Sequence, residues 1–142
     1  MINWKQRYQQ AHEHWFKQNT PTAYADGHYC QPKYPDVRRA NGLTLAICNF
    51  VNWNGYRATR ISTTGRQVGG KWIYGTTRKG TADINITLKG FAIQAEIKVG
   101  ADRPSEHQLK EQAKERAAGG VYEFFSTMEQ FIEFYDRFLE SK

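Results

Sequence analysis

Residues 83–98 read Asp83-Ile84-Asn85-Ile86-Thr87-Leu88-Lys89-Gly90-Phe91-Ala92-Ile93-Gln94-Ala95-Glu96-Ile97-Lys98. Apolar and polar side chains alternate on both sides of Lys89-Gly90, which predicts two short strands joined by a tight turn. Such a turn pairs residue 88 with 91, 86 with 93 and 83 with 96. One face of the hairpin is then apolar and the other is polar, because successive side chains of a strand point to opposite faces.

The predicted pairing brings two acidic side chains together on the polar face. Asp83 and Glu96 lie directly across from each other, with Cβ atoms about 5 Å apart, and Lys98 shares their face. Facing carboxylates destabilise a sheet unless something neutralises them, and a divalent cation would do so. The three residues therefore indicate a metal-dependent phosphodiester site. The alternative is a half-exposed sheet face with ordinary polar side chains.

Length and composition limit the class of protein. The chain has 142 residues, which suits one domain with its own core, and 39% of them are hydrophobic, which argues against general disorder. No apolar run approaches the length of a membrane span, and the first residues lack the pattern of a signal peptide. We therefore expect an intracellular, cytoplasmic protein with no membrane partner. Cys30 and Cys48 are expected to be free thiols.

Positive charge is concentrated in the segment before the carboxylate pair. Residues 33–80 carry nine Lys or Arg and one acid, Asp36, which gives a balance of +8. Residues 81–142 carry eight basic and eleven acidic residues, which gives −3. The basic segment suits a polyanionic partner such as nucleic acid. The alternative is a solvated basic face without a partner.

Periodicity and turn residues predict the other elements. Helices are expected over 4–18, 41–54, the residues after Ser105, and the residues after Thr127; strands are expected over 56–62 and 121–125. A long loop is expected over 19–37, and either a mobile basic loop or an irregular hairpin over 63–80. Between residues 41 and 125 the order is helix, strand, strand, strand, helix, strand, with an extra helix at each end. This order predicts an α/β or α+β domain.

Three short motifs follow one another in the second half of the chain: Gly80-Thr81-Ala82-Asp83, Glu96-Ile97-Lys98 and Ser105-Glu106-His107-Gln108. With helix 41–54, Gly55 and Arg60 before them, they resemble the PD-(D/E)xK nuclease superfamily. Within it they resemble the VRR-NUC group, whose members are similar to Holliday-junction resolvases. The resemblance covers about residues 41–125 and implies a restriction-endonuclease-like core. Residues 1–40 would be an N-terminal extension and 126–142 a C-terminal helix.

The resemblance implies a metal-dependent deoxyribonuclease that leaves a 5′-phosphate. Asp83 and Glu96 would hold Mg²⁺ or Mn²⁺, with the backbone carbonyl of Ile97 as a third ligand. Lys98 would orient or activate the attacking water, and Gln108 would reach toward the metal from the next helix. For Gln108 the alternative is a capping box with Ser105, in which each residue hydrogen bonds to the backbone of the other.

The implied partner is DNA, cut according to its structure, as in branched or junction DNA, rather than its sequence. A homodimer is expected by analogy, and stand-alone domains of this kind are often carried by phages. Basic side chains would contact phosphates and an aromatic one would stack on bases. The predicted contacts are Arg60, Arg66, Lys71, Trp72, Arg78 and Lys79. For Trp72, and for Tyr74 beside it, the alternative is that the ring anchors its loop to the core.

Two departures from the family pattern stand out. Ala82 replaces a Pro, which is a common variation. The family also carries a Glu on its first core helix, whereas this chain has no acid between Asp36 and Asp83, and Asn41 lies near the expected position. The missing Glu favours an alternative function, a nucleic-acid-binding module with a nuclease fold and degraded catalysis. A third alternative is a small interaction protein that binds no nucleic acid.

Overall fold

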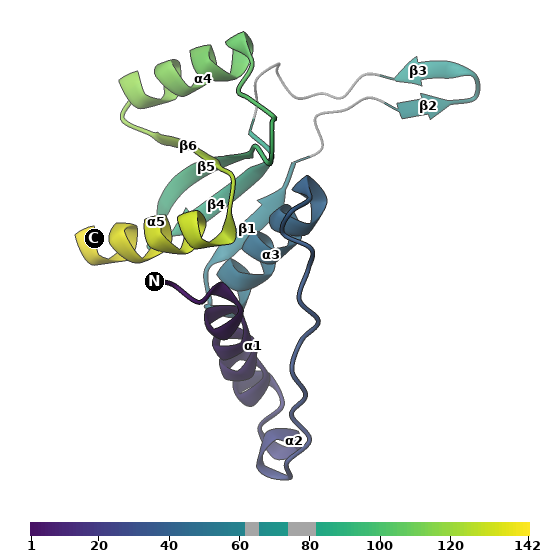
Figure 1. Cartoon of the computed structure of the whole chain (residues 1–142), viewed down its shortest axis with the longest axis vertical. Helices are drawn as coiled ribbons and strands as arrows, with labels where there is room; N and C mark the ends of the chain where they lie inside the picture. The colour runs from purple at the N-terminus through teal and green to yellow at the C-terminus, as the bar shows by residue number, and fades with distance from the viewer. Residues whose placement is uncertain (62–65, 74–81) are drawn as a thin grey trace.

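The structure is a computed structural model of the chain, and it describes residues 1–61, 66–73 and 82–142, with the backbone alone for 66–68, 72 and 73 (Figure 1). Within these residues it is a mixed α+β fold with five helices and a four-stranded sheet. In chain order the elements are α1 (Trp4–Asn19), α2 (Pro21–Ala25), α3 (Ala40–Trp53), β1 (Arg57–Arg60), β2 (Arg66–Val68), β3 (Lys71–Ile73), β4 (Ile84–Leu88), β5 (Phe91–Ile97), α4 (Glu106–Ala117), β6 (Val121–Phe125) and α5 (Met128–Ser141).

The four-stranded sheet has the order β1-β4-β5-β6, with antiparallel pairs except for the parallel pair β5 and β6. The predicted hairpin register is confirmed, since Leu88 pairs with Phe91 and Ile86 with Ile93. Both turn residues have positive φ, 49° at Lys89 and 85° at Gly90. This is the combination that a two-residue type I′ turn requires, and its twist matches that of the strands it joins.

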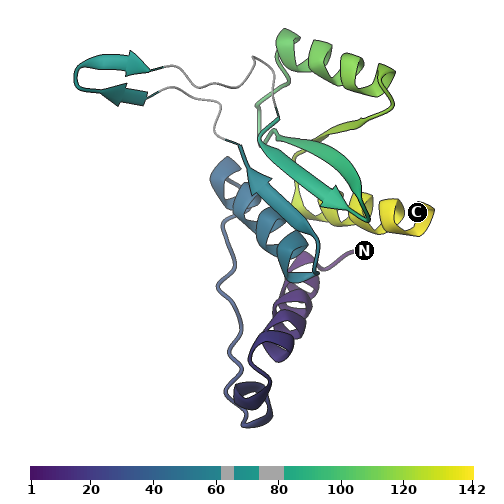
Figure 2. The same cartoon turned by 180° about the vertical axis from the view of Figure 1, so that it is seen from behind.

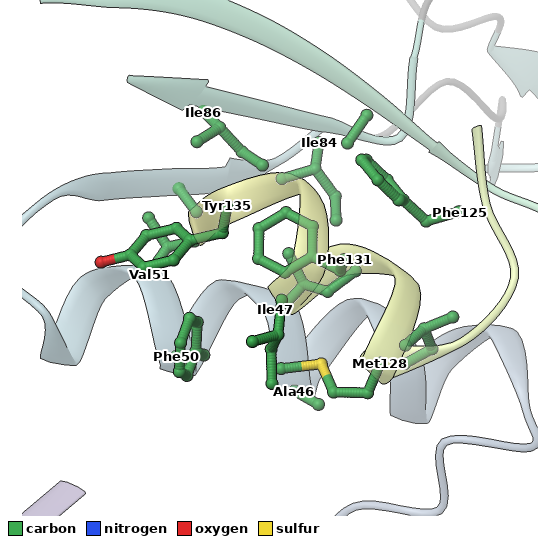
Figure 3. Packing of buried hydrophobic residues seen from close by; sticks show 14 of the residues in the cluster. Ala46, Ile47, Phe50, Val51, Ile84, Ile86, Phe125, Met128, Phe131 and Tyr135 are labelled. Carbon is green, nitrogen blue, oxygen red and sulfur yellow. The ribbon is translucent and has the colours of Figure 1, made fainter. Parts of the chain in front are cut away.

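Helices α1, α3 and α5 form the core on one face of the sheet, and α4 lies on the other face against β6 (Figures 1 and 2). Figure 3 shows how β4 meets the helices: Ile84 and Ile86 point toward Phe131 of α5 and Ile47 of α3. Helix α1, which precedes the region of the three motifs, contributes to this core. Arg7 of α1 forms a bidentate ion pair with Asp136 of α5, with hydrogen bonds of 2.9 and 2.8 Å.

Most predicted elements are confirmed, and one is wrong. The helices beginning near residues 4 and 41 and the strands near 57 and 121 lie where expected. The segment 19–37 is not all loop, because Pro21 begins the five-residue helix α2. Pro suits a first helical position, where its missing N–H would have no partner and its φ is already helical.

The segment 63–80 combines a hairpin with residues outside the described part of the chain. β2 and β3 pair with each other, and Gly69 and Gly70 form their turn. The described residues of this segment therefore agree with the irregular-hairpin alternative. In the described ranges no helix has the length and apolar character needed to cross a membrane. Cys30 and Cys48 are free thiols, as predicted.

Candidate functional site

Asp83 and Glu96 lie opposite each other at one end of the β4–β5 strand pair, as predicted. Asp83 directly precedes β4, and its carbonyl accepts a 2.7 Å hydrogen bond from the N–H of Ile61, which holds it beside β1. Its own N–H donates to Glu96 Oε2 at 3.1 Å. Its carboxylate in turn accepts from the N–H of Ile97 at 3.0 Å. Each carboxylate is therefore held by the backbone of the opposite strand.

Glu96 is the more buried member of the pair, with 4% of its surface exposed. Burial raises the pKa of its carboxyl group to about 8, and the negative charge of Asp83 and a hydrogen bond between the two side chains add to the effect. Lys98 opposes the shift without cancelling it. At neutral pH the pair holds a proton unless a cation replaces it, because a bound metal requires the deprotonated carboxylate.

Lys98 stands between two acids. Its Nζ lies 3.7 Å from Glu96 Oε1 and 3.8 Å from Asp102 Oδ2, and 13% of its side chain is exposed. Asp102 follows the turn at Gly100, where its N–H donates to the carbonyl of Val99. Asp102 was not among the predicted site residues. The signal that could have found it is its position four residues after Lys98, across a glycine turn.

Gln108 forms the predicted capping box with Ser105 and also contacts Glu96. Its Oε1 accepts from the N–H of Ser105 at 2.8 Å, and Ser105 Oγ accepts from the N–H of Gln108, which completes the capping box. Its Nε2 donates to Glu96 Oε1 at 2.7 Å. The side chain thus joins the start of α4 to the carboxylate pair.

Tyr122 of β6 lies beside the site and was also not among the predicted site residues. It is buried on the face that α4 covers, and burial together with the charges of Glu96 and Asp83 raises the pKa of its hydroxyl. Its carbonyl accepts from Gln112 Nε2 of α4 at 3.0 Å. The β5–β6 register pairs it with Gln94 and so places it next to Glu96, but the sequence of residues 121–125 alone does not reveal that register.

Arg60 lies on the other face of the sheet. It pairs with Ile84, so its side chain points to the helical face, where it donates to Asn41 Oδ1 of α3 at 2.7 Å. Asp36, the nearest acid in sequence before α3, binds Arg38 at 2.9 Å instead, and this bond lowers the pKa of the Asp36 carboxyl group.

Three of the other predicted nucleic-acid contacts lie on the separate hairpin β2–β3. Arg66 lies on β2, and Lys71 and Trp72 lie on β3, outside the four-stranded sheet. Lys71 is exposed. Tyr74, Arg78 and Lys79 lie outside the described residues.

The donor set suits a hard cation. Asp83 and Glu96 would supply two carboxylates, and Ile97, which ends β5, would supply a backbone carbonyl. In the part of the chain that the structure describes, no group of three or more His, Cys, Asp and Glu side chains could surround a metal ion. Mg²⁺ is commonly held by one or two carboxylates while it keeps several waters, so the pair fits it.

No protein-family model matches this chain, and no curated protein is detectably similar to it.

Proposed function

We propose that the chain is a metal-dependent DNA nuclease with a restriction-endonuclease-like core, similar to the VRR-NUC group. The observation that carries the proposal is the Asp83–Glu96 pair, in which Glu96 is buried and is contacted by Lys98 and Gln108. Two juxtaposed carboxylates and an ammonium group on one strand pair can hold a divalent cation, a water and a phosphate together.

The order of elements supports the proposal. From α3 to β6 the four-stranded sheet and its helices follow helix, strand, strand, strand, helix, strand, with the hairpin β2–β3 inserted after β1. The carboxylate pair lies at one end of the two central strands, where β4 begins and β5 ends.

Each residue has a distinct task in this proposal. Bound Mg²⁺ or Mn²⁺ would polarise the phosphate and stabilise the charge that develops on its oxygens. Asp83 and Glu96 would hold the ion through carboxylate oxygens in their deprotonated form. Lys98 orients the attacking water and offsets negative charge. Gln108 fixes the orientation of the Glu96 carboxylate through its amide.

The substrate side of the proposal follows from the charge distribution. Arg60, Arg66 and Lys71 would contact phosphates, which orients DNA without reading its sequence. Structure-selective cutting of branched or junction DNA, stacking by Trp72, a homodimer and action inside a cell belong to the same proposal.

Cleavage of labelled DNA tests the proposal. Single-stranded, duplex, flap and four-way-junction DNA are incubated with Mg²⁺, Mn²⁺ or EDTA and wild type, Asp83→Asn or Lys98→Ala. Metal-dependent cleavage should fall by about 100-fold or more in both variants. The matched controls are Asp26→Asn and Lys17→Ala, which change exposed residues of the N-terminal segment. Cleavage that persists in EDTA, or equally in both site variants, would overturn the proposal.

One observation favours the second candidate, a nucleic-acid-binding module with degraded catalysis. The first turn of α3 presents Asn41, bound to Arg60, where the family has a Glu. Tight DNA binding without cleavage under any metal would support this candidate. Asn41→Glu separates the two, because it should create cleavage only if the missing carboxylate is what limits the wild type.

A further inference from the structure

The sheet face that carries the carboxylate pair is open over β1, β4 and β5. Among the described residues α4 is the only helix on this face, and it packs against β6 (Figure 2). Away from the carboxylate pair, the side chains of β1, β4 and β5 that point to this face are exposed or half-buried, whereas those between them are buried. They are Arg57, Thr59, Asn85, Thr87, Ala92 and Gln94.

The register arranges these side chains in rows next to the site. Thr59 pairs with Asn85 and Asn85 with Gln94, so the three form one row across the sheet. Asp83 and Glu96 lie two residues further along on the same face, which is about 7 Å. This distance between the rows is similar to the length of one nucleotide along an extended strand of DNA. Arg57 lies in the row beyond, on the side away from the carboxylates.

The chemistry of the open face differs from that of the helical surfaces. On α4 and α5, exposed Lys and Arg pair with exposed Glu, as in Lys110–Glu106 and Arg137–Glu133. The rows on the open face contain no acid. Arg57 has no ion pair, and Asn85 and Gln94 have no side-chain hydrogen bond, with any other residue that the structure describes. These donors and acceptors are therefore available to a ligand, and the single charge among them is positive.

We propose that this open face binds the DNA strand on one side of the phosphate that is cut. Thr59, Asn85 and Gln94 hydrogen bond to the sugar and phosphate of the neighbouring nucleotide, and Arg57 binds the phosphate beyond it. The proposal rests on the proposed nuclease function, because the carboxylate pair defines where the cut phosphate lies. It adds DNA contacts on the four-stranded sheet to those proposed on the hairpin β2–β3.

Binding without cleavage tests the inference. Asp83→Asn is used as the parent, and its affinity for fluorescein-labelled DNA of the form that wild type cuts best is measured over a range of salt. Arg57→Ala, Asn85→Ala and Gln94→Ala should each weaken binding about fivefold. Arg57→Ala should also reduce the slope of log affinity against log salt by about 1, because one phosphate contact is lost.

Matched controls separate site effects from general ones. Gln10→Ala on α1 and Arg137→Ala on α5 remove the same groups from exposed positions off this face and should leave affinity unchanged. Asn85→Asp and Gln94→Glu keep the shape of the side chain and add a negative charge that repels the DNA phosphates, so they should weaken binding about tenfold or more. The melting temperature of every variant should stay close to that of the parent, because all these side chains are exposed or half-buried.

The outcomes distinguish the two proposals. If the parent binds DNA and the face variants bind as tightly as the controls, the inference is wrong and the nuclease proposal stands. If wild type neither cuts nor binds DNA, both fail. A stronger effect of the same variants on RNA than on DNA would overturn the assignment of DNA as the partner of this face.

Discussion

Gln108 and Glu96 are joined by a 2.7 Å hydrogen bond from the amide of one to Oε1 of the other. The same Gln108 side chain accepts the N–H of Ser105 and so caps α4. The start of α4 and the orientation of the buried carboxylate therefore depend on one residue. A substitution at Gln108 changes both, and a substitution at Ser105 changes the cap alone.

Gln108→Ala should cost about 1 kcal/mol of stability, because the reciprocal cap is broken. It should also leave Glu96 without its amide donor, so the metal concentration that gives half-maximal cleavage should rise. Denaturant unfolding gives the first quantity and a Mg²⁺ titration of cleavage gives the second.

Ser105→Ala is the control for this prediction. It removes the hydroxyl that accepts from the N–H of Gln108 but touches no atom of Glu96. It should lose similar stability and keep the metal dependence of wild type. Equal shifts in metal dependence for the two variants would show that the Gln108–Glu96 contact has no part in the site.

Stability without metal should fall as pH rises from about 4.5 to about 8. The folded protein raises the pKa of Glu96 from 4.5 to about 8, so in this window the unfolded chain releases a proton that the folded chain keeps. Proton release on unfolding favours the unfolded state more at each higher pH, and the loss levels off above the folded pKa. Melting temperatures measured with EDTA across this range test it.

Glu96→Gln is the matched variant, since it keeps the shape and cannot ionise. Its melting temperature should change less than that of wild type between these pH values. Added Mg²⁺ should raise the melting temperature of wild type above pH 8 and leave that of the variant unchanged, because binding to the folded state alone stabilises it. A wild-type curve as flat as that of the variant would contradict the raised pKa.

The sequence predicted the hairpin and the carboxylate pair because the information is local. Alternation sets the faces, and Lys89-Gly90 sets the turn, so the register of Asp83 against Glu96 follows. The burial of Glu96 could not be predicted in this way. It depends on β6 and α4, which the chain brings to β5 through a parallel pairing that no local pattern specifies. Tyr122 was missed for the same reason.

Leu109, Ala113 and Ala117 lie at four-residue spacing along α4 but form no buried face. All three are exposed, and no residue of α4 is buried. The helix is held by polar contacts from Gln108 and Gln112 instead. A polar attachment of this kind leaves no hydrophobic pattern in the sequence.

Two substitutions test this difference in packing. Phe131→Ala on α5 should destabilise the fold by about 3–5 kcal/mol, because the ring is fully buried against Phe50 and Phe125. Leu109→Ala should change stability by no more than about 0.5 kcal/mol, since half of that side chain is exposed. Denaturant midpoints at constant slope measure both. A large cost at Leu109 would mean that another surface covers α4 in solution.

Gly42→Ala should destabilise the protein although it lies in a helix, where Ala is favoured over Gly by about 1 kcal/mol. A Cβ at residue 42 would lie 1.9 Å from the backbone carbonyl oxygen of Asp36, so the turn before α3 would have to move. Displacing packed backbone costs about 1–3 kcal/mol, which outweighs the gain in helix propensity for most of that range.

Leu45→Ala, at an exposed position of the same helix, should be nearly neutral. The unfolding free energies of the two variants decide the matter, and a Gly42→Ala protein more stable than wild type would show that the Asp36 turn does not pack on α3. The turn carries Arg38 and precedes Asn41, so its displacement should also disturb the contact between Asn41 and Arg60.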